Sequence, residues 1–285
     1  MSQAIAFALL SLLFAGINDV VFKRYASKDR SRGMYVFGIG LTWTLFQAVI
    51  FHARAIPFEW EIATLYYGLA AGALLTASNI LLLEGLARIP VSLGSTIYRL
   101  NTIGVVVLSF FLLDEPFGEM KSIGILCGIA AVLFLYKRDD GKSHASNFLP
   151  AFCAVIIASL FRAAYGVVSK AALLAGASPD GMLLLFSASW IAGGAIYAGF
   201  REKRFRITAK KSFYSLLSGV LVCLIVNFLL LAVKYGEATV VIPIANMSFV
   251  VAMLIALFMK MEVLTFRKSC AVVLAAISIL LLSRV

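Results

Sequence analysis

Long apolar runs separated by short polar connections are the dominant pattern of this chain. A bilayer core of about 30 Å is crossed by roughly 20 apolar helical residues. Connections such as KRYASKDRSRG and REKRFRITAKK carry the charges and turn residues expected of loops. The pattern therefore predicts an all-α integral membrane protein with ten transmembrane helices, at residues 3–22, 34–53, 62–86, 91–113, 120–136, 148–169, 181–200, 212–233, 238–259 and 268–283.

Composition supports a lipid environment. The chain is 62% hydrophobic and only 14% charged, with a mean hydropathy of +0.99, whereas soluble domains are about 25% charged. The N-terminal segment is apolar without a basic leader, so we expect a first span rather than a cleaved signal. The four cysteines lie singly in apolar stretches, which predicts neither a disulfide nor a metal site, and no cofactor is expected.

An internal repeat divides the chain into two halves. Shifting the sequence by 147 residues aligns rare residue types without gaps: Trp43 with Trp190, Glu115 with Glu262, and Lys121-Ser122 with Lys268-Ser269. The same shift places Arg99 on Asn246. We therefore predict two repeats of five helices each, at residues 1–143 and 144–285.

The distribution of loop charges predicts that the second repeat is inverted. An odd number of helices per repeat reverses the insertion of the second half. The loop between the first and second expected helices is basic, whereas the equivalent loop between the sixth and seventh is not. The loop between the seventh and eighth is basic, whereas the equivalent loop between the second and third is not. Because short cytoplasmic loops collect Lys and Arg, both termini are expected on the non-cytoplasmic side. The net charge of +11 then reflects membrane topology, and binding of nucleic acid is not expected.

The two hairpins that precede the last helix of each half resemble a known family. Their sequences are DEPFGEMKSIGILCG (114–128) and MEVLTFRKSCAVV (261–273). With ten helices in two repeats, the chain resembles the drug/metabolite transporter superfamily in its EamA-type branch, over nearly its whole length. The second hairpin departs by having Ala271 and Ala275 where the first has Gly124 and Gly128. The resemblance implies transport of small metabolites across the inner membrane, often export of amino acids.

Polar and ionisable residues inside the helices predict a binding site, because such residues face the bundle interior and mark function. The guanidinium groups of Arg99 and Arg162 suit a carboxylate or phosphate. Tyrosines would form aromatic walls, asparagines would donate hydrogen bonds, and Asp19 would receive an amine or a coupling proton. The candidate substrate-binding residues are Asn18, Asp19, Asn79, Tyr98, Arg99, Arg162, Tyr165, Asn227 and Asn246.

Structural roles are the alternatives to these functional ones. Arg99 or Arg162 could pair permanently with Asp19 or with carbonyls, as a structural bridge between the halves. Asp19 could instead pair with Lys23 at i+4. Glu84 is expected to pair with Arg88 in solvent. The three asparagines could simply bond between helices. Trp43 and Trp190 are expected to be packing residues.

Three classes of function fit a membrane protein of this kind. We expect a secondary active transporter, an exporter of a small anionic or zwitterionic metabolite such as an amino acid, working by alternating access in the cell inner (plasma) membrane as a self-sufficient monomer. Proton coupling is left open. The alternative is a membrane subunit or flippase-type carrier of a lipid-linked or nucleotide-linked sugar. An enzyme is not expected, because HExxH and a second intramembrane aspartate are absent from the sequence.

Overall fold

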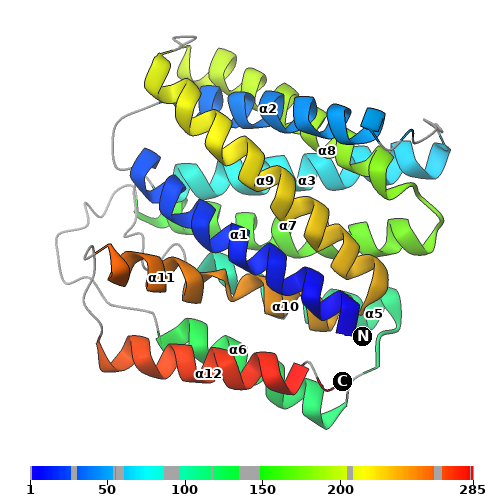
Figure 1. Cartoon of the computed structure of the whole chain (residues 1–285), viewed down its shortest axis with the longest axis vertical. Coiled ribbons are helices and arrows are strands. Elements are labelled where there is room, and N and C mark those ends of the chain that lie inside the picture. Colours follow the sequence, from blue (N-terminus) through cyan, green and yellow to red (C-terminus); the bar gives the residue numbers. More distant parts are fainter. Residues whose placement is uncertain are drawn as a thin grey trace.

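The computed structural model describes residues 2–26, 31–53, 55, 61–86, 97–116, 118–134, 148–203, 208–259, 265–282 and 284. Within these residues every regular element is helical (Figure 1). The first half contains α1 (Ser2–Ala26), α2 (Arg32–Ala53), α3 (Ile62–Leu86), α5 (Asn101–Leu113) and α6 (Glu119–Phe134). The second half contains α7 (Phe148–Leu174), α8 (Pro179–Tyr197), the π-helical turn η2 (Ala198–Glu202), α9 (Ala209–Tyr235), α10 (Ala238–Asn246), α11 (Ser248–Phe258) and α12 (Phe266–Leu282).

Most of these helices have the length and apolarity needed to cross a bilayer. Seven candidate spans are found in the described residues, and shorter apolar helices cover Ile97–Leu113 and Ser269–Leu282. Large apolar side chains such as Phe111, Phe200 and Phe258 are exposed, as they are where a surface faces lipid rather than water. The described helices overlap each of the ten expected spans, and the fold is an all-helical, multi-pass membrane fold.

The expected span 238–259 is matched by a candidate span at Ala238–Ile255, but its helix is interrupted rather than continuous. α10 ends at Asn246 and α11 begins at Ser248. Between them Met247 donates its N–H to the carbonyl of Ile244 and accepts from the N–H of Val250. These i→i+3 bonds are tighter than those of an α-helix, so the chain turns at this point.

The expected span 91–113 contains the same break at the equivalent position. Leu100 donates its N–H to Ile97 and accepts from the N–H of Ile103, which repeats the Met247 pattern 147 residues earlier. Residues 87–96 lie outside the described part of this span. The repeat offset therefore relates the backbone turns as well as the side chains.

The bundle is built from pairs of helices that belong to opposite halves. α1 packs against α9, and the equivalent pair α7 and α3 packs in the same way. Both pairs are antiparallel: Ala4 contacts Gly236 and Tyr25 contacts Tyr214 at the two ends of the first pair. α2 also packs against α9, and the equivalent helices α8 and α3 pack against each other. Two further pairs, α2–α8 and α6–α12, are antiparallel.

These contacts fix the relative direction of the halves. Four described helices of the first half each run opposite to their equivalent in the second half. The opposed pairs are α1 and α7, α2 and α8, α3 and α9, and α6 and α12. Figure 1 shows α1 running from right to left and its counterpart α7 running from left to right. The two halves are thus related by an approximate two-fold axis that crosses the helix direction.

Close approach of the backbones explains glycines at equivalent crossings. A Cβ on Gly219 would lie 2.4 Å from Cβ of Thr42, and a Cβ on Gly72 would lie 2.4 Å from Oγ of Ser189. The two crossings are equivalent, because Gly219 and Ser189 lie 147 residues after Gly72 and Thr42. Small residues at such crossings allow membrane helices to pack closely.

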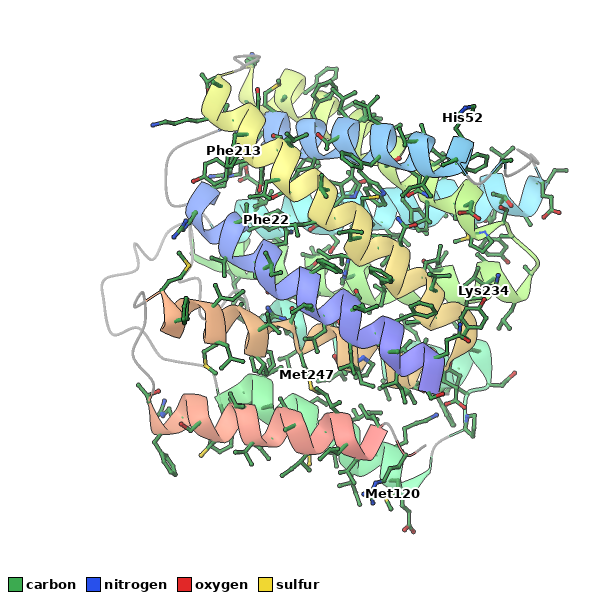
Figure 2. The ribbon with its side chains drawn as sticks, in the orientation of Figure 1. Phe22, His52, Met120, Phe213, Lys234 and Met247 are labelled. Carbon is green, nitrogen blue, oxygen red and sulfur yellow. The ribbon has the colours of Figure 1, made fainter. Side chains whose placement is uncertain are left out.

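Contacts between equivalent residues mark the two-fold axis. Trp43 and Trp190 are buried edge to face with ring centroids 6.1 Å apart, between α2 and α8. They are packing residues, as expected. The second contact joins Arg99 to Asn246. In Figure 2 Met247 lies near the middle of the molecule along the helix direction, while His52 and Lys234 lie toward one end. The helix breaks are therefore central.

Candidate functional site

The two helix breaks release backbone carbonyls in the middle of the bundle. In a continuous helix the Asn246 carbonyl would accept from the N–H of Val250, but that N–H bonds to Met247 instead. The Asn246 carbonyl accepts from Nη1 of Arg99 at 2.7 Å. In the other half, the released Arg99 carbonyl accepts from the Thr102 hydroxyl at 3.3 Å. The breaks thus supply polar groups where apolar helices would offer none.

Arg99 is the centre of a dense set of contacts. Its Nη2 donates to Oδ2 of Asp19 at 2.5 Å, and its Nη1 also donates to Oγ of Ser248 at 2.8 Å. The guanidinium lies over the ring of Phe249 with its Cζ 5.4 Å from the centroid. With the Asn246 carbonyl, these bonds use three of the five N–H groups of a guanidinium. The Arg99 side chain is 16% exposed.

Asp19 joins α1 to this cluster. Besides Arg99, its Oδ2 accepts from the Ser248 hydroxyl at 3.3 Å, at the first residue of α11. The Asp19 side chain keeps 38% of its exposure, so part of the carboxylate is accessible beside a largely buried guanidinium. The neighbouring Asn18 is only 5% exposed, and its Oδ1 has no hydrogen-bond partner among the described residues.

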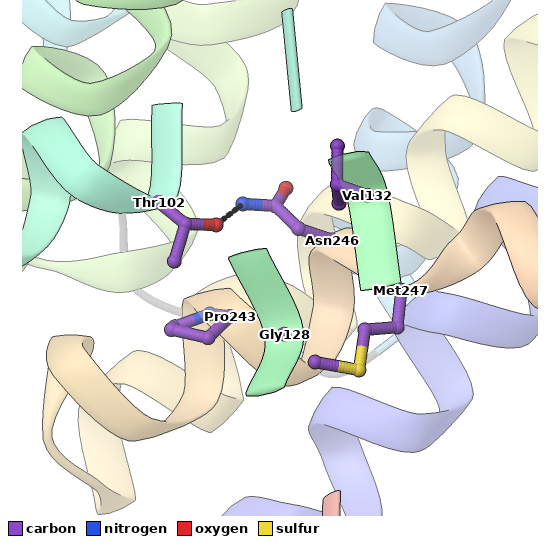
Figure 3. A pocket seen from close by; sticks show the side chains of 6 residues that line it. All are labelled: Thr102, Gly128, Val132, Pro243, Asn246 and Met247. Atoms are coloured by element: carbon purple, nitrogen blue, oxygen red, sulfur yellow. Dashed lines mark hydrogen bonds between the residues drawn. The ribbon is translucent and has the colours of Figure 1, made fainter. Parts of the chain in front are cut away.

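Asn246 lies across the axis from Arg99 and bonds to the start of α5. Its Nδ2 donates to Oδ1 of Asn101 at 2.6 Å and to Oγ1 of Thr102 at 3.1 Å. A small pocket of about 10 Å³ opens beside this bond, lined by Thr102, Gly128, Val132, Pro243, Asn246 and Met247 (Figure 3). A cavity of this size holds about one water molecule. The described residues therefore leave room for little more than a water molecule beside this bond.

Arg162 lies at the same level on α7 but has different surroundings. Its Cζ lies 5.2 Å from the ring centroid of Tyr165. One turn earlier, the hydroxyl of Ser159 donates to the backbone carbonyl of Tyr98 at 3.4 Å, directly beside Arg99. No carboxylate of the described residues forms an ion pair with Arg162. Around the breaks, the described cations Arg99 and Arg162 outnumber the carboxylate of Asp19.

The two candidate tyrosines have different neighbours. Tyr165 is buried and meets Phe186 edge to face at 5.5 Å. The hydroxyl of Tyr98 accepts from Ser78 at 3.2 Å, which ties this residue to α3. Tyr98 and Tyr165 are therefore aromatic neighbours of the central polar groups, at the crossing of α3 and α7.

Two of the candidate asparagines lie outside this cluster. Nδ2 of Asn227 donates to Oε1 of Gln47 at 2.9 Å, between α9 and α2. Nδ2 of Asn79 donates to the Leu75 carbonyl of its own helix at 2.8 Å. The structure thus gives Asn227 the interhelical bond that the alternative interpretation predicted, and gives Asn79 a bond within α3.

The expected ion pairs have partly different partners. Asp19 pairs with Arg99, while the side chain of Lys23 lies outside the described residues. Glu84 accepts from Nη1 of Arg32 at 2.6 Å and from the hydroxyl of Tyr197, so it connects α3 to α2 and α8. Its predicted partner Arg88 also lies outside the described residues.

Sequence reasoning missed Asn101, Ser248 and Phe249. Asn101 and Ser248 are equivalent across the repeat, because they are 147 residues apart and each begins the helix after a break. Their signal was the repeat offset itself: both lie two residues beyond the aligned pair Arg99 and Asn246. A search for polar residues by helical spacing passed over them because each helix was assumed to be continuous.

This arrangement belongs to a recognisable class of membrane protein. Inverted repeats with broken helices that meet at a central polar site are typical of secondary transporters. The model of the EamA-like transporter family matches residues 2–137 and 149–284, so the chain belongs to the EamA-like transporter family, which is of the drug/metabolite transporter type. The two matched segments correspond to the two halves of the fold.

Comparison with solved structures supports the fold. A crystal structure with 16% sequence identity superposes with a TM-score of 0.83, covering 100% of this chain and 99% of that one. At this identity the likeness shows the fold alone. A comparison with curated proteins found no match.

Proposed function

We propose that this protein is a secondary active transporter that exports a small anionic or zwitterionic metabolite, such as an amino acid. The observation that carries the proposal is the Arg99–Asp19 ion pair beside the two-fold axis, where the two broken helices meet. A substrate carboxylate would bind Arg99, and in a zwitterion the ammonium would bind Asp19.

The charges around the breaks support an anionic group. Two arginines and one aspartate leave an excess of positive charge in the described centre. α5 and α11 also begin here, and helix N-termini carry partial positive charge. Guanidinium donors form a rigid fork that matches a carboxylate. Arg162, which lacks an ion pair in the described residues, would hold a second acceptor of the same substrate.

The symmetry of the fold supports alternating access. In this proposal ten helices span the membrane as two inverted repeats, 1–143 and 144–285, with both termini on the non-cytoplasmic side. The halves would rock around the Arg99 site, which would open to each side in turn. Substrate would bind by exchanging with the contacts that Arg99 and Asp19 make to each other.

A thermal-shift screen of the purified protein tests the proposed substrate class. The panel comprises amino acids, organic acids, nucleotide sugars and organic cations without a carboxylate. Stabilisation by amino acids or organic acids is expected, because a ligand that binds only the folded state raises its melting temperature. Stabilisation by the cations alone would overturn the arginine–anion proposal. Stabilisation by nucleotide sugars alone would favour the alternative function as a carrier of sugar conjugates.

The same screen on Arg99→Gln assigns the binding site. Loss of the ligand-induced shift in this variant is expected. Arg201→Gln is the matched control, because Arg201 is an exposed arginine in η2 far along the chain from the breaks. An equal shift in both variants would remove Arg99 from the substrate site.

A further inference from the structure

A second set of buried charges lies at the end of the bundle that carries the N-terminus. Glu115 follows α5 and is buried, and its carboxylate accepts from the backbone N–H groups of Ala238 and Thr239 at 2.8 and 2.9 Å. It also accepts from the Thr239 hydroxyl at 2.6 Å. A carboxylate here satisfies the free N–H groups of the first turn of α10 and complements its dipole.

The local backbone aims Glu115 at this target. Asp114 adopts φ 51°, ψ 32° at the end of α5, a left-handed conformation that reverses the chain. The Glu115 N–H then bonds back to the Ser109 carbonyl. The glutamate of the hairpin motif therefore joins the end of a helix of the first half to the start of a helix of the second.

Lys121 forms a second connection between the halves at this end. Its side chain is 1% exposed and forms an ion pair with Glu237, the residue before α10, while Nζ also donates to the Pro116 carbonyl at 2.6 Å. Lys170 of α7 donates to the carbonyls of Val233 and Gly236 at 2.8 and 2.7 Å. This holds the end of α9 in place, so the corner between α9 and α10 is fixed.

These contacts lie at the far ends of the two helices that frame the central site. Glu115 lies just beyond the end of α5, which begins at the break at Leu100. Glu237 lies just before α10, which ends at the break at Met247. The two helices pack against each other along the way. For the centre to open toward this end, α5 and α10 must separate, and the contacts of Glu115 and Lys121 must break.

The sequence makes the two ends of the transporter unequal. Glu262 and Lys268 repeat Glu115 and Lys121 at the offset of 147 residues, but Pro90 stands where the first set has its partner Glu237. The position equivalent to the acidic partner of Lys121 is therefore not acidic in the second set. An inverted repeat with identical ends would have no built-in preference for either conformation, whereas this chain has Glu237 at one end and Pro90 at the equivalent position of the other.

We propose that the Lys121–Glu237 pair is a latch that keeps the substrate-free protein closed at the end carrying the N-terminus. This inference rests on the proposed transport function, and it adds the side from which the empty protein takes up its substrate. With that end on the non-cytoplasmic side, the resting protein takes up substrate from the cytoplasm. Release of the latch after substrate has entered the centre would then open the site to the non-cytoplasmic side.

Pulsed electron resonance between two spin labels measures the state of this end. The labels are placed at Gly118→Cys in the hairpin and Lys234→Cys at the end of α9, in a chain whose four native cysteines are replaced by alanine. A Cβ at Gly118 meets no atom within 4 Å and Lys234 is exposed, so neither label disturbs packing. The protein is reconstituted in liposomes without substrate.

One short distance is expected for the protein with intact latch residues. Glu237→Gln leaves Lys121 buried without a counter-charge, which is strongly unfavourable, and is expected to raise the ratio of open to closed molecules about tenfold. Glu237→Asp retains the carboxylate and is expected to keep the short distance. Glu119→Gln, the same change at an exposed position of α6, is the matched control and should change nothing.

Two results would overturn the latch. One is a substantial open population in the labelled protein with Lys121 and Glu237 intact, a result that does not depend on the folding of a latch variant. The other is a Glu237→Gln distribution identical to that of Glu119→Gln. A shift in distance without transport of any solute by the same liposomes would instead contradict the proposed function while leaving the conformational preference established.

Discussion

Arg99 shows how a membrane protein can keep a charge in an apolar span. Its guanidinium is satisfied by a carboxylate, a hydroxyl and a backbone carbonyl that a helix break has released. A central arginine costs about 2.5–3.5 kcal/mol on insertion scales, and these bonds offset that cost. The partly exposed Asp19 carboxylate remains accessible, which a purely structural bridge does not require.

A double-mutant cycle at Arg99 and Asp19 separates a bridge from a binding site. Asp19→Asn is expected to lower the melting temperature because it leaves the arginine without its counter-charge. Arg99→Gln combined with Asp19→Asn should recover most of that loss but remain inactive in transport. Recovery of both stability and transport in the double variant would mean that the pair is only structural.

The helix breaks are the elements that create the site. Pro243 has no N–H to donate to the Thr239 carbonyl, and α10 ends one turn later. In the first half the turn at Leu100 has the same hydrogen bonds, although the sequence has Thr96 at the position equivalent to Pro243. Proline is therefore not the common cause, and the shared feature is the position within the repeat.

The glycine crossings give a prediction about helix packing. Gly72→Val and Gly219→Val place a side chain where a Cβ alone would approach its neighbour to 2.4 Å. Overpacking of this kind costs about 1–3 kcal/mol, so both variants should unfold at lower temperature than the unmodified protein. Gly118→Ala, where a Cβ meets nothing, should not. Unchanged melting temperatures for the two valine variants would argue against the close crossings.

Much of this element-level organisation could be predicted from the sequence. Hydropathy located the helices, and the offset of 147 residues aligned Arg99 with Asn246, which are in contact in the structure. The turn at Met247 could not be predicted because a hydropathy window averages composition and is insensitive to backbone hydrogen bonds. A polar residue within an apolar helix marks Asn227 as a candidate for the site. Its bond to Gln47 of α2 could not be predicted, because the sequence does not show which helices pack together.

The whole molecule is symmetric in its scaffold and asymmetric in its charges. Arg99 is matched by Asn246, and Asp19 is matched by Gly166, where a Cβ would lie 2.6 Å from Cδ1 of Ile242. The central ion pair therefore exists on one side of the axis only. A single site results, rather than two equivalent ones.

Reporter tags test the proposed topology of the whole molecule. With inverted repeats and ten spans, tags at both termini should react with a membrane-impermeant reagent from the non-cytoplasmic side. A cysteine in the basic segment 204–207 should be protected from it until the membrane is opened. Reaction of the two termini from opposite sides would contradict the topology.

Transport by the purified protein is the most direct test of the account. Liposomes containing the protein are loaded with a radiolabelled amino-acid mixture, and efflux is followed for the unmodified protein, Arg99→Gln, Arg162→Gln and the control Arg201→Gln. The account predicts efflux with the unmodified protein and the control, and a loss of at least about tenfold in the two central variants. Efflux that is unchanged in both Arg99→Gln and Arg162→Gln would contradict the central claim that these arginines bind the transported anion.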